Sequence, residues 1–171
     1  MTYKVPPEPA AKRIALWRRL KGMGAVYLQN GVCLLPQTDE HMLQLKILEN
    51  DATEMGGETI LLSTTSLDKK QEAKVIARFK ADRDDQYREF LGKCEAFEAK
   101  IAKEVAKQKY TYAELEEEDN DLKKLQSWLE KIRNLDFYQA SLSALATERM
   151  KHCETVLADY AQRVFDANQG L

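Results

Sequence analysis

The chain has 171 residues, of which 44% are hydrophobic and 32% charged, and its formal net charge is −2. This composition suits a folded chain with a buried core, excludes an intrinsically disordered one, and allows one domain or two small ones. No apolar run approaches the roughly 20 residues that cross a bilayer, and no signal-peptide core begins the chain, so we expect a cytoplasmic protein without membrane contact.

The charge is unevenly distributed along the chain. Residues 1–35 contain six Lys or Arg and one Glu, a net charge of +5. Residues 36–66 contain one Lys and six acidic residues, a net charge of −5. A total charge near zero does not indicate nucleic-acid binding, but the basic first segment keeps that function open.

The first elements in the chain are a short strand, a helix and a hairpin. Residues 2–5 favour a strand, and a helix is expected from about residue 9 to Gly22, after a Pro-rich bend. Two apolar strands, 25–29 and 32–35, follow the helix and are joined by Asn30-Gly31. This dipeptide predicts a type I′ turn with positive φ at both central positions.

A second helix and a last strand complete this part of the chain. The helix is expected over residues 38–55, with Thr38 as its N-cap, and a strand over 58–63. The order (β)αββαβ over residues 1–65 predicts a ferredoxin-like unit of α+β class, with helices on one face of an antiparallel sheet.

The first helix has one apolar side and one basic side on a helical wheel. Its apolar side includes Trp17, which we therefore place in the core, and the other apolar positions are Ile14, Leu16, Leu20 and Met23. Arg13 falls among the apolar residues, and Lys21 lies near their edge. Lys12, Arg18 and Arg19 lie on the opposite side, where Lys and Arg side chains can contact phosphates.

After residue 66 the pattern changes to long helices. One helix is expected from about residue 66 to 108, a second after the capping box Thr111-x-x-Glu114, and a third after a loop at 135–141. Apolar residues recur at spacings close to 3.5 along each helix. Residues 66–171 therefore predict a three-helix antiparallel bundle whose apolar seams pack within the molecule, the alternative being a partner interface.

Four segments resemble one known family, in order along nearly the whole chain. The segments read RIALWRRLKGMGAVYLQNGVCLLP, ARFKADRDDQYREF, LEEEDNDLKKLQSWLEKIRNLDFYQASL and CETVLADYAQRVF. They resemble the N-terminal domain of the ChrB family, bacterial regulators of chromate resistance. The resemblance implies a PaaX-like or CRISPR-nuclease-like α+β domain followed by helices.

The resemblance also implies transcriptional regulation of chromate export and DNA binding by basic N-terminal residues. Regulators of this family carry a C-terminal chromate-sensing domain, so the resemblance implies a standalone N-terminal domain here. A homodimer is expected because repressors commonly read paired half-sites. The residues that this resemblance assigns to DNA binding are Lys12, Arg13, Arg18, Arg19 and Lys21.

The sequence gives only weak indications of a catalytic or metal site. We interpret the acidic run Glu116, Glu117, Glu118, Asp119 and Asp121 as a solvated helix face, and the three cysteines as apolar core thiols. His152-Cys153 lacks the spacing of a catalytic triad or a metal site. We therefore expect no enzyme activity, no cofactor and no metal. The alternative to DNA binding is a protein-interaction or assembly module that acts through its helices.

Overall fold

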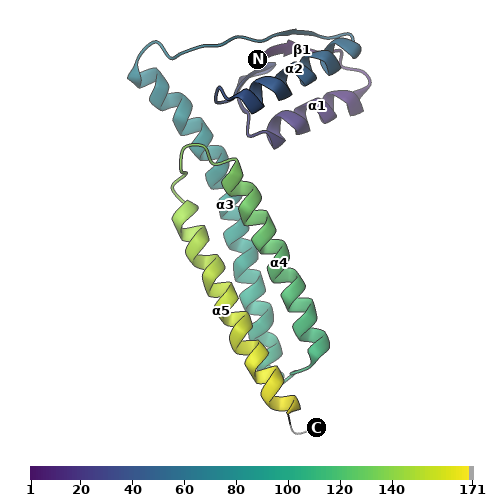
Figure 1. The fold of residues 1–171 in the computed structure, drawn as a ribbon, viewed down its shortest axis with the longest axis vertical. Coiled ribbons are helices and arrows are strands. Elements are labelled where there is room, and N and C mark those ends of the chain that lie inside the picture. The colour runs from purple at the N-terminus through teal and green to yellow at the C-terminus, as the bar shows by residue number, and fades with distance from the viewer. Residues whose placement is uncertain (170–171) are drawn as a thin grey trace. The chain divides into compact units, whose positions relative to one another are not determined.

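The structure is a computed structural model that describes residues 1–169, with five helices and four strands in this range (Figure 1). The chain divides into two compact units, Met1–Asp82 and Arg83–Leu171. The first unit contains all the described strands, and the second is helical, so the mixed class predicted from the sequence is confirmed. The predicted change at residues 65–66 lies in the segment that joins the last strand to the third helix.

The strands form one antiparallel sheet in the order β2-β3-β1-β4. The strand nearest the N-terminus is central, since Thr2 pairs with Val32 on one side and with Ile60 on the other. The short first strand thus joins the hairpin to the last strand. The strands are β1 (Thr2–Lys4), β2 (Val26–Gln29), β3 (Val32–Leu34) and β4 (Glu58–Ile60).

Two helices, α1 (Ala10–Gly22) and α2 (Asp39–Glu54), pack against the sheet around one small apolar core. The side chain of Thr38 accepts the amide hydrogen of His41 at 3.1 Å and caps α2, as the sequence predicts. The buried residues that the two helices contribute to this core are Leu16, Leu20, Leu48 and Ala52.

The hairpin between β2 and β3 is present, but its turn differs from the predicted type. Gly31 has a φ of 73°, whereas Asn30 is not among the described non-glycine residues with positive φ. The strand register also shifts between Tyr27 and Gln29, a β-bulge. One glycine and a bulge therefore reverse the chain here, where the sequence predicts a turn with two positive φ angles.

Three helices form the second unit and lie side by side, consecutive helices running in opposite directions (Figure 1). They are α3 (Lys69–Ala106), of which the part from Arg83 belongs to this unit, α4 (Tyr112–Asn134) and α5 (Ser143–Asn168). Within residues 1–169, no helix is both long and apolar enough to cross a bilayer.

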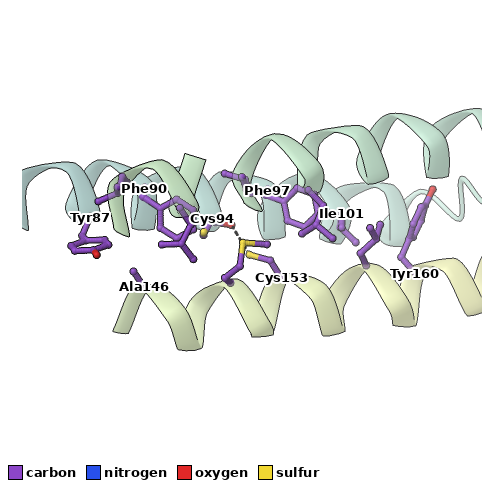
Figure 2. Close-up of a cluster of buried hydrophobic side chains, with 14 of the residues drawn as sticks. Tyr87, Phe90, Cys94, Phe97, Ile101, Ala146, Cys153 and Tyr160 are labelled. Carbon is purple, nitrogen blue, oxygen red and sulfur yellow. Dashed lines mark hydrogen bonds between the residues drawn. The ribbon is translucent and has the colours of Figure 1, made fainter. Parts of the chain in front are cut away.

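The core of this bundle is formed by apolar side chains that recur at three- and four-residue spacings. Figure 2 shows the side chains of α3 facing those of α5 along this core. Each helix therefore buries about one residue per turn, and these residues form the core between the three helices. The residues labelled in that view are Tyr87, Phe90, Cys94, Phe97, Ile101, Ala146, Cys153 and Tyr160.

One acidic side chain in α4 is buried, which corrects the expectation that the whole acidic run is solvated. Glu118 is fully buried four residues before Leu122, on the same seam. Lys100 of α3 reaches this position, and its Nζ lies 3.0 Å from Glu118 Oε1. The same Nζ lies 2.7 Å from Glu117 Oε1 and 3.1 Å from Asp121 Oδ2.

Burial governs the pKa of Glu118. Desolvation raises the pKa of its carboxyl, and the nearby Lys100 ammonium only partly opposes this effect. The pKa of Lys100 is raised in turn, chiefly by its hydrogen bond to Glu117. Burying the charged Glu118 carboxylate therefore costs free energy, and the Lys100 ammonium offsets part of that cost.

The three cysteines are free and buried, which confirms their interpretation as core thiols. Burial raises the pKa of the Cys33 thiol in the first unit, so this thiol stays neutral near physiological pH. In the bundle, the Cys153 thiol lies 3.9 Å from the carbonyl oxygen of Cys94, toward which it donates (Figure 2).

Replacing Gly92 with Ala is expected to raise the free energy of unfolding by about 0.5–1 kcal/mol. Gly92 lies within α3, and a Cβ atom built there meets no atom within 4 Å. Alanine loses less backbone entropy on folding than glycine and creates no clash at this position. Urea denaturation followed by circular dichroism measures the change. The reverse substitution at exposed Ala99 should lower stability by a similar amount, and a destabilised Gly92→Ala variant would contradict the prediction.

Candidate functional site

The five basic residues assigned to DNA binding all lie on or beside α1, but they point to different surroundings. Lys12, Arg13 and Arg18 are exposed, and within the described residues none of them forms an ion pair. Arg19 pairs with Asp51 of α2. Lys21 Nζ lies 2.8 Å from Asp82 Oδ2 in the same unit. The basic residues therefore do not form one uniform strip.

The apolar side of α1 is narrower than the helical wheel predicts. Leu16 and Leu20 are buried, but Trp17 remains 48% exposed and Ile14 44% exposed. The prediction that Trp17 lies in the core is wrong. Only the positions that point directly at the small sheet are covered, since its strands are three or four residues long.

Trp17 and Ile14 instead line a groove of about 780 Å³ on the first unit. Arg13, Trp17 and Lys21 recur every four residues and so share one flank of α1. The other residues that line the groove belong to β1, β2 and the segments that follow them: Tyr3, Lys4, Val5, Tyr27, Asn30 and Gly31.

Two tyrosines form the sheet side of this groove. The hydroxyl groups of Tyr3 and Tyr27 lie 2.7 Å apart and share a hydrogen bond, and the two rings meet edge to face. Burial raises the pKa of both phenols, and for Tyr27 the hydrogen bond to Tyr3 raises it further. Both hydroxyl groups therefore stay neutral near physiological pH.

The electrostatics of the groove favour an anion. Lys4, Arg13 and Lys21 supply cations, and no acidic residue is among the described residues that line it. Asp82 offsets the charge of Lys21, which leaves Lys4 and Arg13 as the cations without an ion pair in the described chain. An exposed indole beside such cations suits a ligand that combines negative charge with a flat apolar surface.

The structure brings together two of the five predicted residues and adds others that the sequence analysis missed. Arg13 and Lys21 line the groove, whereas Lys12, Arg18 and Arg19 do not. The missed residues are Lys4, Trp17 and the two tyrosines. The four-residue spacing from Arg13 through Trp17 to Lys21 is the sequence signal that could have indicated an aromatic ring between two cations.

The fold and the groove define a class of protein: a small α+β unit with a cationic, aromatic groove, joined to a helical bundle. The chain belongs to the ChrB N-terminal family, because the model of that family, described as "Protein ChrB, N-terminal", matches residues 13–171. The membership expected from the four sequence segments is thus confirmed.

One curated relative is Protein ChrB of Cupriavidus metallidurans, which is 32% identical over 91 residues. The match covers 53% of this chain and 28% of that protein, so the matched part spans little more than a quarter of the relative's length. No solved structure matches the chain.

Proposed function

We propose that this protein is a non-enzymatic, DNA-binding transcriptional regulator linked to chromate resistance, and that α1 contacts the DNA. Membership of the ChrB N-terminal family supports the link to chromate resistance. A cytoplasmic homodimer is part of the proposal, because paired half-sites are commonly read by two-fold symmetric proteins.

One observation carries the DNA-binding proposal: three exposed cations on α1 have no ion pair within the described residues. They are Lys12, Arg13 and Arg18. Other basic residues, such as Lys100 and Arg149, form ion pairs with acidic residues of the bundle. Cations that no acid holds are available for phosphates, and each phosphate contact releases counterions from DNA.

Fluorescence anisotropy with the DNA upstream of the gene, compared with scrambled DNA across a salt series, tests the proposal. Specific binding whose logarithmic affinity falls with the logarithm of salt concentration is expected. The Arg18→Ala variant should bind both DNAs more weakly and reduce the salt slope by about one. No binding at low salt would contradict the proposal.

Arg88→Ala is the matched control for this experiment. Arg88 is an exposed arginine of the bundle, paired with Asp85 at 2.6 Å, so its replacement removes the same charge far along the chain from α1. If Arg88→Ala weakens binding as much as Arg18→Ala does, total charge rather than α1 determines affinity.

A protein-interaction module is the second candidate, and α2 supplies the observation that favours it. Met42, Leu43 and Ile47 are exposed on this helix, Leu43 by 64%. Adjacent exposed apolar residues on a helix are typical of a surface that another protein covers. Binding of a protein with unchanged affinity in an Arg18→Ala variant, together with no DNA binding, would favour this candidate.

We also propose that the first unit follows the ferredoxin-like plan. The strand order β2-β3-β1-β4 and the antiparallel pairings support it. Helices α1 and α2 contribute to one shared core with the sheet, which supports their position on one face. In this plan the hairpin is scaffold that holds α1 in place.

A further inference from the structure

The groove beside α1 has a composition that phosphate contacts alone do not explain. Trp17 and Ile14 keep nearly half of their surface exposed, although both are large apolar residues on a helix beside a core. A helix that only neutralises phosphates needs cations and polar groups on its exposed side, not an indole between Arg13 and Lys21.

We propose that this groove binds an unpaired nucleotide of single-stranded DNA, with its base stacked on Trp17 and its phosphate held by Arg13 and Lys4. The proposal deepens the proposed function and rests on it in one respect, that DNA is the ligand. It assigns a separate role to the flank of α1 that carries Trp17.

The flat apolar surface in the groove points to a base. Indole rings stack on nucleobases of any sequence, and such stacking combined with neighbouring cations is how many proteins hold single strands. Trp17 lies four residues after Arg13 and four before Lys21, so one face of α1 presents the ring between two positive groups. The volume of about 780 Å³ is in the range of sites that hold a small organic ligand.

The charges around Trp17 point to the phosphate of the same nucleotide. Lys4 and Arg13 line the groove without an ion pair in the described chain, so a phosphate would meet cations that no acid already neutralises. The tyrosine hydroxyl groups remain neutral because burial raises their pKa, so they do not repel an anion. Asn30 adds an amide that can donate to a base edge or a phosphate.

Stacking on Trp17 requires an unpaired base rather than a base pair. Bases in a duplex are stacked on their neighbours, so a tryptophan reaches the face of a base only when that base is unstacked. Lys12 and Arg18 lie outside the groove and remain available for a duplex backbone. The cations of α1 outside the groove thus suit duplex DNA, and those inside the groove suit single-stranded DNA.

The test compares two labelled single strands of about ten units, a length suited to one binding groove. One is oligothymidylate, and the other is an abasic oligomer of the same length and charge. Fluorescence anisotropy at one fixed low salt concentration gives the affinity of each strand for the full chain. We expect oligothymidylate to bind more tightly, because only this strand has bases that can stack on Trp17.

The Trp17→Leu variant should weaken oligothymidylate binding by about tenfold, the low to middle part of the range for loss of one stacked base. Its affinity for the abasic strand should stay within about twofold, since leucine changes no charge. Trp17→Phe, which keeps an aromatic ring, should lie between Trp17→Leu and the original chain. Arg13→Ala should weaken both strands.

Tyr112→Leu is the matched control, because Tyr112 is an aromatic residue of the bundle with 55% of its surface exposed. This variant should bind both strands as the original chain does. Equal affinity of the original chain for the two strands, or an unchanged affinity of Trp17→Leu for oligothymidylate, would overturn the inference. Circular dichroism confirms that the variants are folded.

A parallel measurement with duplex DNA distinguishes failure of this inference from failure of the proposed function. If duplex DNA binds with the expected salt dependence but Trp17→Leu leaves oligothymidylate binding unchanged, the inference fails and the proposed function stands. If oligothymidylate binds in a Trp17-dependent way and the upstream duplex does not bind at low salt, the inference stands and the duplex regulator proposal fails.

Discussion

Replacing Lys100 with Met is expected to lower the free energy of unfolding by about 2 kcal/mol, less than the cost of breaking a fully buried ion pair because the Lys100 side chain is 37% exposed. Glu118 is fully buried, and the Lys100 Nζ lies 3.0 Å from its Oε1. Without the ammonium, the buried carboxylate must either stay charged and unpaired or take up a proton. Methionine keeps most of the apolar stem of lysine and removes the ammonium group, so the change acts mainly through the charge. Urea denaturation of the two proteins measures the difference.

The Glu118→Gln substitution identifies the source of this loss. In the Glu118→Gln background, Lys100→Met should cost less than about 1 kcal/mol, because the surface contacts to Glu117 and Asp121 contribute little. Lys103→Met is the control for loss of an exposed lysine on α3 and should have little effect. An equal cost of Lys100→Met with and without Glu118 would contradict this account.

The same pair gives a pH dependence with a definite sign. Burial raises the pKa of the Glu118 carboxyl above the 4.5 of an exposed glutamate. A group with a raised pKa in the folded state contributes stability below its unfolded pKa, and this contribution is lost as the pH rises through the folded value. Glu118→Gln should therefore stabilise the protein near neutral pH and lose that advantage below about pH 4.5.

Replacing Gly31 with Ala is expected to destabilise the first unit by about 3 kcal/mol. Gly31 has a φ of 73°, and a Cβ atom there would lie 2.4 Å from the carbonyl oxygen of Tyr3. The backbone conformation alone costs alanine about 1–2 kcal/mol, and relief of the clash must move β1. This movement also strains the hydrogen bond from the Tyr3 amide to the Gly31 carbonyl, which is 2.7 Å long.

Amide hydrogen exchange measures this effect where it arises. The exchange of the Tyr3 and Cys33 amides should accelerate by about a hundredfold, which is the population change that corresponds to about 3 kcal/mol. The Tyr3 amide donates to the Gly31 carbonyl in the hairpin turn, and the Cys33 amide of β3 donates to the carbonyl of Met1, which directly precedes β1. Gly22→Ala is the control, since a Cβ atom at Gly22 meets no atom within 4 Å. Exchange that is equally slow in Gly31→Ala and Gly22→Ala would contradict the prediction.

Local signals in the sequence were sufficient to locate the elements of the fold. The prolines, glycines and capping residues mark element ends by physical effects that act within a few residues, and the ends of α1, α2 and α4 agree with them. The turn type at Asn30-Gly31 was not predictable in the same way. Its geometry depends on the β-bulge in β2, which is set by pairing with β3 rather than by the dipeptide.

The candidate site was less predictable, because it depends on the small size of the sheet beside α1. A helical wheel shows on which side of α1 a residue lies, but it does not show how far the neighbouring sheet extends. With strands of three and four residues, the sheet covers Leu16 and Leu20 and leaves Trp17 exposed. The burial of Glu118 was missed because a charged side chain is normally exposed. Its position four residues before Leu122, on the same seam, indicates burial instead.

The position of the tryptophans gives each unit its own optical reporter. The chain has two of these residues, and Trp17 belongs to the first unit while Trp128 belongs to the second. Trp17 is half exposed, whereas Trp128 packs edge to face on Phe90 with ring centres 5.7 Å apart. Their emission spectra therefore arise in different environments, one half exposed and the other partly buried against Phe90. A chain that keeps only one of the two indoles reports the melting of one unit alone.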